Sequence, residues 1–259
     1  MKAGLSTACL YPLETEKALE QLIARGFSRF ELFLNATSEL DTPLSGQLLE
    51  LSREREVVAV HPFTSGTETM LFFSNYPRRF RDGLELYRRF FHFAAQLGAS
   101  FVVFHGARHG LGVPPQLYLQ RYALLHQAAR EEGITLLQEN VERCMSRDSS
   151  LFRLLRTHLP EAGFVLDLKQ ARRAGVPLEE MLDAMGEGLR YIHLSDDGPR
   201  GDCLPLGEGQ LDVPSLLCTL ARRGFDGCLT LELYSGSCGQ PGQLEQSNAL
   251  LEEAIRSLG

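Results

Sequence analysis

The chain has 259 residues, close to the ~250 that one closed α/β barrel needs, and 44% of them are hydrophobic, enough for a large core. Its net charge of −7 argues against a nucleic-acid partner, which requires a basic face. The six cysteines are scattered, no segment approaches the ~20 apolar residues of a membrane span, and the first residues lack the apolar core of a signal peptide. We therefore expect a cytoplasmic protein that binds neither nucleic acid nor membranes.

Eight apolar runs alternate along the chain with eight segments of helical pattern. Strands are predicted at 2–7, 29–32, 57–61, 101–105, 134–139, 164–167, 189–194 and 227–233. Helices are predicted at 14–25, 43–54, 83–97, 115–132, 149–158, 177–185, 213–223 and 243–258. Two long connections, 62–82 and 195–211, receive no element.

A glycine separates helix from strand in four of these units: Gly26, Gly98, Gly133 and Gly224. Glycine tolerates the left-handed conformation that ends a helix, and the continuous apolar run that follows is typical of a parallel strand buried on both faces. The pattern predicts a single (β/α)8 TIM barrel over residues 1–259, with parallel strands and outer helices. A doubly wound open sheet would need a glycine-rich phosphate turn after the first strand, and residues 9–12 offer none.

Seven of the apolar runs end in an acidic residue or a histidine: Glu31, His61, His105, Glu139, Asp167, His193 and Glu232. The carboxyl ends of the strands form the active face of a TIM barrel. We therefore expect these side chains to surround one site.

The last four of them are the strongest candidates for metal ligands. Glu139, Asp167, His193 and Glu232 come from four successive strands and form a hard, mostly oxygen ligand set, which suits Mn²⁺, Mg²⁺, Co²⁺ or Zn²⁺. Three carboxylates in one cavity repel one another and raise one another's pKa unless a cation neutralises them. The sequence predicts one divalent ion here.

His61 and His105 end the third and fourth strands, and two interpretations stay open. They either hold a second metal ion beside Glu139 or bind substrate through hydrogen bonds. Glu31 ends the second strand and is a candidate for substrate binding, although a glutamate there also pairs commonly with an arginine.

Three further polar residues are candidates for substrate contacts. Lys169 follows Asp167 by two positions, so strand alternation would place both on one face, where the lysine pairs with Asp167 or a substrate oxygen. A Schiff-base role for Lys169 would leave the carboxylates unexplained. The connection 195–211 carries Arg200, a candidate for a phosphate or carboxylate contact, and Asp202.

Seven short motifs occur in order along the chain: Val60-His61-Pro62, Phe104-His105-Gly106, Gln138-Glu139-Asn140, Leu166-Asp167, Ile192-His193-Leu194, Pro205-Leu206-Gly207-Glu208-Gly209 and Leu231-Glu232-Leu233. With them the whole chain resembles the xylose-isomerase-like barrels. That superfamily contains sugar-phosphate isomerases and epimerases as well as phosphodiesterases of the endonuclease IV type.

Resemblance to the epimerase branch implies one divalent metal on Glu139, Asp167, His193 and Glu232, with Glu139 and Glu232 doubling as acid and base. The implied reaction is proton transfer through an enediolate of a small sugar or sugar phosphate.

Resemblance to the endonuclease branch implies a first ion on His61, His105 and Glu139. The chain departs from that branch at the third ion, because Gln170 and Leu204 replace two histidines and only Asp202 is kept. A tri-zinc site is therefore not expected, and Gln170 is a candidate for a hydrogen bond to a sugar hydroxyl. A di-metal phosphodiester hydrolase and a non-catalytic sugar-binding barrel stay open as alternatives, and the outer helical surface allows a homo-oligomer.

Overall fold

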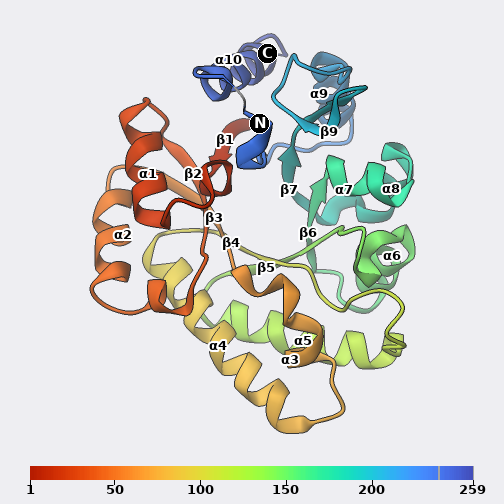
Figure 1. Cartoon of the computed structure of the whole chain (residues 1–259). Helices are drawn as coiled ribbons and strands as arrows, with labels where there is room; N and C mark the ends of the chain where they lie inside the picture. The colour runs from red at the N-terminus through yellow and green to blue at the C-terminus, as the bar shows by residue number, and fades with distance from the viewer. Residues whose placement is uncertain (239, 259) are drawn as a thin grey trace.

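The computed structural model describes residues 1–238 and 240–258, in which eight parallel strands close into a barrel (Figure 1). Around the barrel the strands follow the order β1-β10-β7-β6-β5-β4-β3-β2. They are β1 (Lys2–Ser6), β2 (Arg29–Phe33), β3 (Glu56–His61), β4 (Phe101–Phe104), β5 (Thr135–Glu139), β6 (Gly163–Asp167), β7 (Leu189–Leu194) and β10 (Cys228–Leu231). The predicted (β/α)8 TIM barrel is confirmed.

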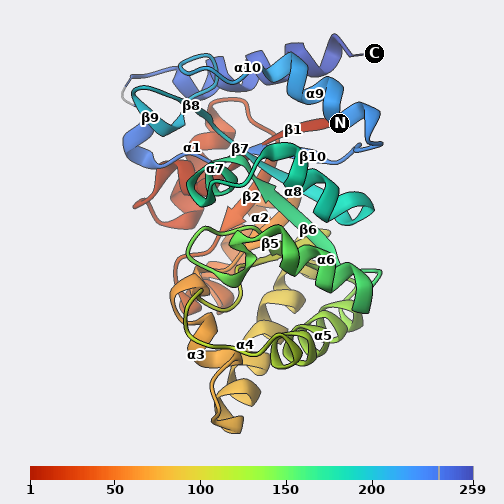
Figure 2. The ribbon, with the colours of Figure 1, turned by 90° about the vertical axis from the view of Figure 1, so that its right-hand side faces the viewer.

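Helices surround the barrel on its outside, as Figures 1 and 2 show from two directions. They are α1 (Thr15–Ala24), α2 (Leu44–Ser52), α3 (Glu68–Phe72), α4 (Pro77–Gln96), α5 (Pro115–Glu131), α6 (Ser149–His158), α7 (Leu168–Ala174), α8 (Leu178–Met185), α9 (Val213–Arg222) and α10 (Gln243–Arg256). The last helix packs beside β1, which brings both ends of the chain to one side of the molecule. Among the described residues, no helix is both long and apolar enough to cross a membrane.

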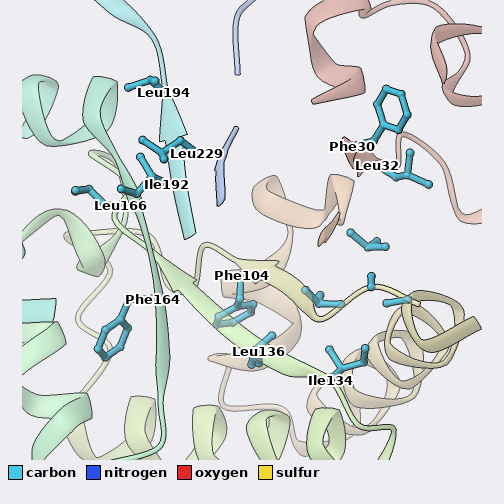
Figure 3. Close-up of a cluster of buried hydrophobic side chains, with 14 of the residues drawn as sticks. Phe30, Leu32, Phe104, Ile134, Leu136, Phe164, Leu166, Ile192, Leu194 and Leu229 are labelled. Atoms are coloured by element: carbon cyan, nitrogen blue, oxygen red, sulfur yellow. The ribbon is translucent and has the colours of Figure 1, made fainter. Parts of the chain in front are cut away.

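Outward-facing strand residues form the main hydrophobic core with the helices. Phe104, Leu136, Phe164 and Ile192 are fully buried between the barrel and its helical layer (Figure 3). Burying one such side chain contributes about 1.5–3 kcal/mol to the free energy of unfolding. The strands therefore need apolar residues on both faces, and this explains their continuous apolar runs.

A smaller cluster fills the inside of the barrel: Val58, Ala59, Val103, Leu137, Val165, Tyr191 and Cys228. Side chains alternate along a strand, so the residue two positions after an interior residue again points inward. Those positions on β5 to β7 are Glu139, Asp167 and His193, and directly after β4 the position is His105. The apolar filling of the barrel thus lies directly below the candidate site.

A glycine separates helix from strand near both ends of the chain, as predicted. Gly26, before β2, has φ of 89°, and Gly224, before β10, has φ of 77°. Only glycine adopts this left-handed conformation without strain, so it can reverse the chain directly after α1 and α9.

Three segments differ from the sequence prediction. The segment 168–174, to which the sequence prediction assigned no element, forms α7, because the Asp167 side chain accepts a hydrogen bond from the backbone N–H of Gln170 and caps the helix. The connection 62–82 contains α3 and the first turn of α4, which begins at Pro77. The connection 195–211 contains an antiparallel hairpin of β8 (Asp196–Gly198) and β9 (Gly201–Leu204).

Candidate metal centre and active site

The four predicted metal ligands come together at the carboxyl end of the barrel. Glu139, Asp167, His193 and Glu232 each offer one ligand atom, and these atoms all lie within 4.8 Å of one another. Nδ1 of His193 lies 3.3 Å from Oε1 of Glu139 and 3.6 Å from Oε2 of Glu232. Asp167 is directly opposite His193 in the pairing of β6 with β7, so the strand register itself aligns these two side chains.

Cationic neighbours keep the two glutamates of this cluster ionised. Burial acts to raise the pKa of Glu139, but His105 and His193 lower it well below its usual range. Burial likewise acts against the charge of Glu232, yet Lys169 and His193 lower its pKa to about 2. Both carboxylates are therefore negatively charged near neutral pH and available to accept a proton or bind a cation.

Asp167 and His193 hold their protons more tightly than usual. Burial raises the pKa of Asp167 to about 6 despite the nearby positive charge of Lys169, and the charge of Glu232 adds to the rise. Burial alone would lower the pKa of His193, but the carboxylates of Glu31 and Glu232 raise it well above its ordinary value. These shifts reflect an excess of carboxylates in a closed space.

The residues at this position fit a divalent ion. Oε2 of Glu139 and Oδ2 of Asp167 are buried and lack a hydrogen bond of good geometry, although Nε2 of His105 and Nζ of Lys169 lie 2.7 and 3.3 Å from them. Buried carboxylate oxygens without a well-directed hydrogen bond are unfavourable, and a coordinated cation compensates for them. Three carboxylates and one imidazole form a donor set that Mn²⁺, Co²⁺, Zn²⁺ or Mg²⁺ accepts.

His61 and His105 adjoin the same cluster from the other side of Glu139. Their Nε2 atoms lie 3.1 Å apart, and Oε2 of Glu139 is 2.7 Å from Nε2 of His105 and 3.6 Å from Nε2 of His61. Burial lowers the pKa of His61, but its contact with Glu139 and the charge of Glu31 outweigh burial and raise it. His61, His105 and Glu139 thus form a second group with metal-ligand geometry.

Glu31 lies behind His193. Its Oε2 is 2.9 Å from Nε2 of His193, whose Nδ1 faces the carboxylates of the cluster, and the side chain is fully buried. A metal-binding histidine commonly donates its other ring N–H to a carboxylate, which fixes the tautomer and the ring orientation. This geometry suits a group that positions His193.

Lys169 reaches the cluster from α7. The prediction that it shares a strand face with Asp167 is wrong, since the strand ends at Asp167; the first turn of the helix brings the side chain back instead. Its Nζ lies 3.1 Å from Oε2 of Glu232 and 3.3 Å from Oδ2 of Asp167, with 2% of the residue exposed. Lys169 therefore neutralises part of the negative charge of two candidate metal ligands.

The other three predicted contact residues lie further out. Oε1 of Gln170 accepts a hydrogen bond from the backbone N–H of Glu142 at 3.0 Å. Arg200, in the connection between β8 and β9, pairs with Glu208 and is largely exposed. Asp202, on β9, pairs with Arg173. The structure thus brings neither Arg200 nor Asp202 into contact with the metal cluster.

Two buried carboxylates bind backbone N–H groups of the segments around the site. Neither was singled out from the sequence. Glu68 on α3 accepts hydrogen bonds from the backbone N–H groups of His105 and Gly106 at 3.1 and 2.6 Å. Asp196 accepts four backbone N–H bonds, from residues 197, 207, 209 and 211. Because both lie in connections without a periodic pattern, the only available signal was an acidic residue next to a turn.

Asn140 is a third supporting residue that the sequence did not single out. Its side chain exchanges two hydrogen bonds with the backbone of Asp167: it accepts from the N–H at 2.7 Å and donates to the carbonyl at 2.9 Å. The signal was available in the motif Gln138-Glu139-Asn140, where a polar residue directly follows a ligand. Asn140 ties the ends of β5 and β6 together and so fixes the separation of Glu139 and Asp167.

The sequence profile of the xylose isomerase-like TIM barrel family matches residues 19–258. The chain belongs to this family. The resemblance identified from the seven motifs is therefore confirmed.

Several proteins similar to this chain are named as sugar epimerases. The chain is 22% identical to the fructoselysine 3-epimerase of Escherichia coli O157:H7, over 98% of this chain and 99% of that protein. A D-tagatose 3-epimerase-like protein has the same fold, with a TM-score of 0.79 at 19% identity, covering 99% of this chain and 98% of the other. The predicted class, an enzyme of the sugar isomerase or epimerase type, agrees with these comparisons.

A protein that contains zinc also shares the fold. The crystal structure of the IolI protein with a bound zinc atom has a TM-score of 0.72 at 18% identity, covering 99% of this chain and 97% of the other. A barrel of this fold can thus hold a metal ion.

Proposed function

We propose that the protein is a divalent-metal-dependent sugar isomerase or epimerase that moves a proton on a carbon next to a carbonyl group. The observation that carries this proposal is the meeting of Glu139 and Glu232 at Nδ1 of His193, within one buried cluster that also includes Asp167. The fructoselysine 3-epimerase of E. coli, a relative over nearly the full length, supports the same class of chemistry.

In this proposal Glu139, Asp167, His193 and Glu232 hold the metal ion. A bound divalent cation would polarise the substrate carbonyl and its neighbouring hydroxyl, which makes the proton on the intervening carbon more acidic. Glu31 keeps the His193 ring in place through its contact with Nε2. Asn140 and the N-terminus of α7 hold Asp167 through their hydrogen bonds.

Glu139 and Glu232 are the proposed acid–base pair. Their lowered pKa values keep them ionised, so either can accept the proton from the substrate carbon and leave an enediolate. The opposite glutamate then returns a proton to the other face, which it must first have taken up from solvent. Turnover therefore exchanges a substrate proton with water.

Deuterium exchange tests this proposal. The protein is loaded with Mn²⁺ and incubated in heavy water with a panel of ketoses, and deuterium is located by NMR. We expect incorporation at the carbon next to the carbonyl, and its loss in Glu139→Gln and Glu232→Gln. The control is Glu131→Gln: Glu131 is the last residue of α5 and forms an exposed ion pair with Arg88 on α4. Absence of exchange with every ketose, although calorimetry shows bound metal, would count against the function.

One observation favours a second candidate, a di-metal phosphodiester hydrolase. The imidazoles of His61 and His105 both face Oε2 of Glu139, which is a geometry suited to another ion. Metal stoichiometry separates the two candidates. One exchangeable ion per chain favours the isomerase, while two tightly bound zinc ions, with cleavage of a bis-aryl phosphate, favour the hydrolase.

A further inference from the structure

A small cavity opens beside Glu232 on the carboxyl face of the barrel. It has a volume of about 270 Å³ and is lined by Ala8, Tyr11, Phe33, Glu232, Leu233 and Tyr234. These residues come from the ends of β1, β2 and β10, which are neighbours in the barrel. Its volume lies just below the roughly 300–1,000 Å³ of common ligand pockets, so it has room for one ring or a short chain.

The cavity is continuous with the proposed active site. Glu232 belongs both to its lining and to the metal cluster. On the opposite side, the ring of Phe33 stacks on His61, with centroids 4.5 Å apart and an interplanar angle of 30°. A substrate that reacts next to Glu232 would therefore extend its remaining atoms along Phe33 and into this space.

Two tyrosines form an exposed aromatic rim. Tyr11 is 56% exposed and Tyr234 is 49% exposed, although both line the cavity. The ring of Tyr234 is held in place: Arg173 donates a hydrogen bond to its hydroxyl at 2.9 Å, and Nζ of Lys169 lies 4.8 Å from its centroid. Aromatic rings that stay exposed at a site lose little entropy when they cover a ligand.

The lining of the cavity offers no positive charge to an anion. Of the described residues that form it, none is a lysine or an arginine, and its one charged side chain is Glu232. The two cations behind Tyr234 are engaged, Lys169 with Asp167 and Glu232, and Arg173 with Asp202. A phosphate placed here would meet a carboxylate and apolar surface, which is unfavourable.

We propose that this cavity binds the non-reacting part of the substrate and that this part is an uncharged apolar or aromatic substituent. The substrate is then a substituted ketose, joined through an ether, glycosidic or amine link to such a group, and it is not a sugar phosphate. This inference rests on the proposed sugar isomerase function and names its substrate class. Tyr11, Phe33 and Tyr234 are the specificity-determining residues.

Binding calorimetry on the Mn²⁺-loaded protein tests the inference without turnover. The probes are D-fructose, its 1-O- and 6-O-benzyl ethers, and its 1- and 6-phosphates. We expect one benzyl ether to bind about tenfold tighter than fructose or more, and neither phosphate to bind tighter than fructose. In Tyr11→Ala and Tyr234→Ala most of the benzyl gain is lost. Tyr76→Ala, which removes an aromatic ring of 53% exposure outside the cavity, keeps it.

The outcomes separate this inference from the proposed function. A benzyl gain that depends on Tyr11 and Tyr234, with no deuterium exchange in any ketose, supports the cavity and rejects the isomerase. Deuterium exchange without a benzyl gain supports the isomerase and overturns the inference. Tighter binding of a phosphate than of the benzyl ethers, or a benzyl gain that persists in both tyrosine variants, also overturns it.

Discussion

Lys169 and Glu232 form a buried ion pair at the edge of the candidate metal site, with 3.1 Å between Nζ and Oε2. The same ammonium group lies 3.3 Å from Oδ2 of Asp167. A metal ion bound by these two carboxylates would have the positive charge of Lys169 as its neighbour. The lysine therefore stabilises the metal-free cluster and opposes the metal electrostatically.

Replacing Lys169 by methionine should raise the affinity for Mn²⁺ by about tenfold or more, because a repulsive charge is removed. The metal-free variant should lose about 3–5 kcal/mol of stability, since two buried carboxylates are left without their cation. Calorimetric titration and thermal unfolding with and without metal measure both effects. Lys17→Met, at an exposed pair with Glu14, is the control. Weaker metal binding in Lys169→Met would mean that the lysine holds the ligands in position.

Glu68 should be essential for the position of His105. It accepts the backbone N–H groups of His105 and Gly106 and the hydroxyl of Tyr87, all inside the protein. In Glu68→Gln an amide NH₂ faces these donors, so we expect a loss of about 2–3 kcal/mol in the free energy of unfolding. Urea unfolding measures it, with Glu85→Gln, on the exposed surface of α4, as control. Equal midpoints for the two variants would contradict this role.

The sequence predicts the barrel and the convergence of the four candidate ligands well, because both depend on local patterns. The apolar runs that end in Glu139, Asp167 and His193 are strands buried on both faces, and strand alternation places those three residues inward. The family resemblance adds the role expected of each residue, as a metal ligand or as an acid–base group.

Contacts between distant residues could not be predicted in this way. Glu68 and His105 are 37 positions apart, and nothing in the connection 62–82 indicates that α3 packs onto the end of β4. The helix after Asp167 was missed because Leu168 and Lys169 continue the alternation of the strand. The hydrogen bond from the backbone N–H of Gln170 to the Asp167 side chain starts a helix there instead. Tyr11 and Tyr234 meet at one cavity only because β1 and β10 close the barrel.

Asp196 should hold the hairpin of β8 and β9 in its folded position. Its carboxylate accepts the N–H groups of residues 197, 207, 209 and 211, so it ties the hairpin to the turn that follows. Asp196→Asn keeps the shape but loses the charge and one acceptor oxygen, and we expect about 2–3 kcal/mol of destabilisation. Trypsin should then cut faster after the exposed Arg200, whereas Asp82→Asn on α4 should leave that rate unchanged. An unchanged rate in Asp196→Asn would rule out this role.

His126 on α5 should make the protein sensitive to mild acid. Only 4% of the residue is exposed, and burial lowers its pKa, assisted by Arg130 and partly opposed by Glu161. The unfolded chain titrates this histidine near pH 6.5, so as the pH falls through that value the unfolded state takes up a proton that the folded state resists. The contribution of His126 is therefore fully present above that pH and is lost on acidification.

The substitution His126→Gln removes this pH-dependent contribution to the free energy of unfolding. Between about pH 7.5 and pH 5.5 the wild-type protein should lose more stability in urea unfolding than the variant does. Both proteins are measured with a chelator, so that the carboxylates and histidines of the metal cluster contribute equally and cancel in the comparison. The same loss of stability in both proteins would show that His126 is protonated as readily in the folded state as in the unfolded chain.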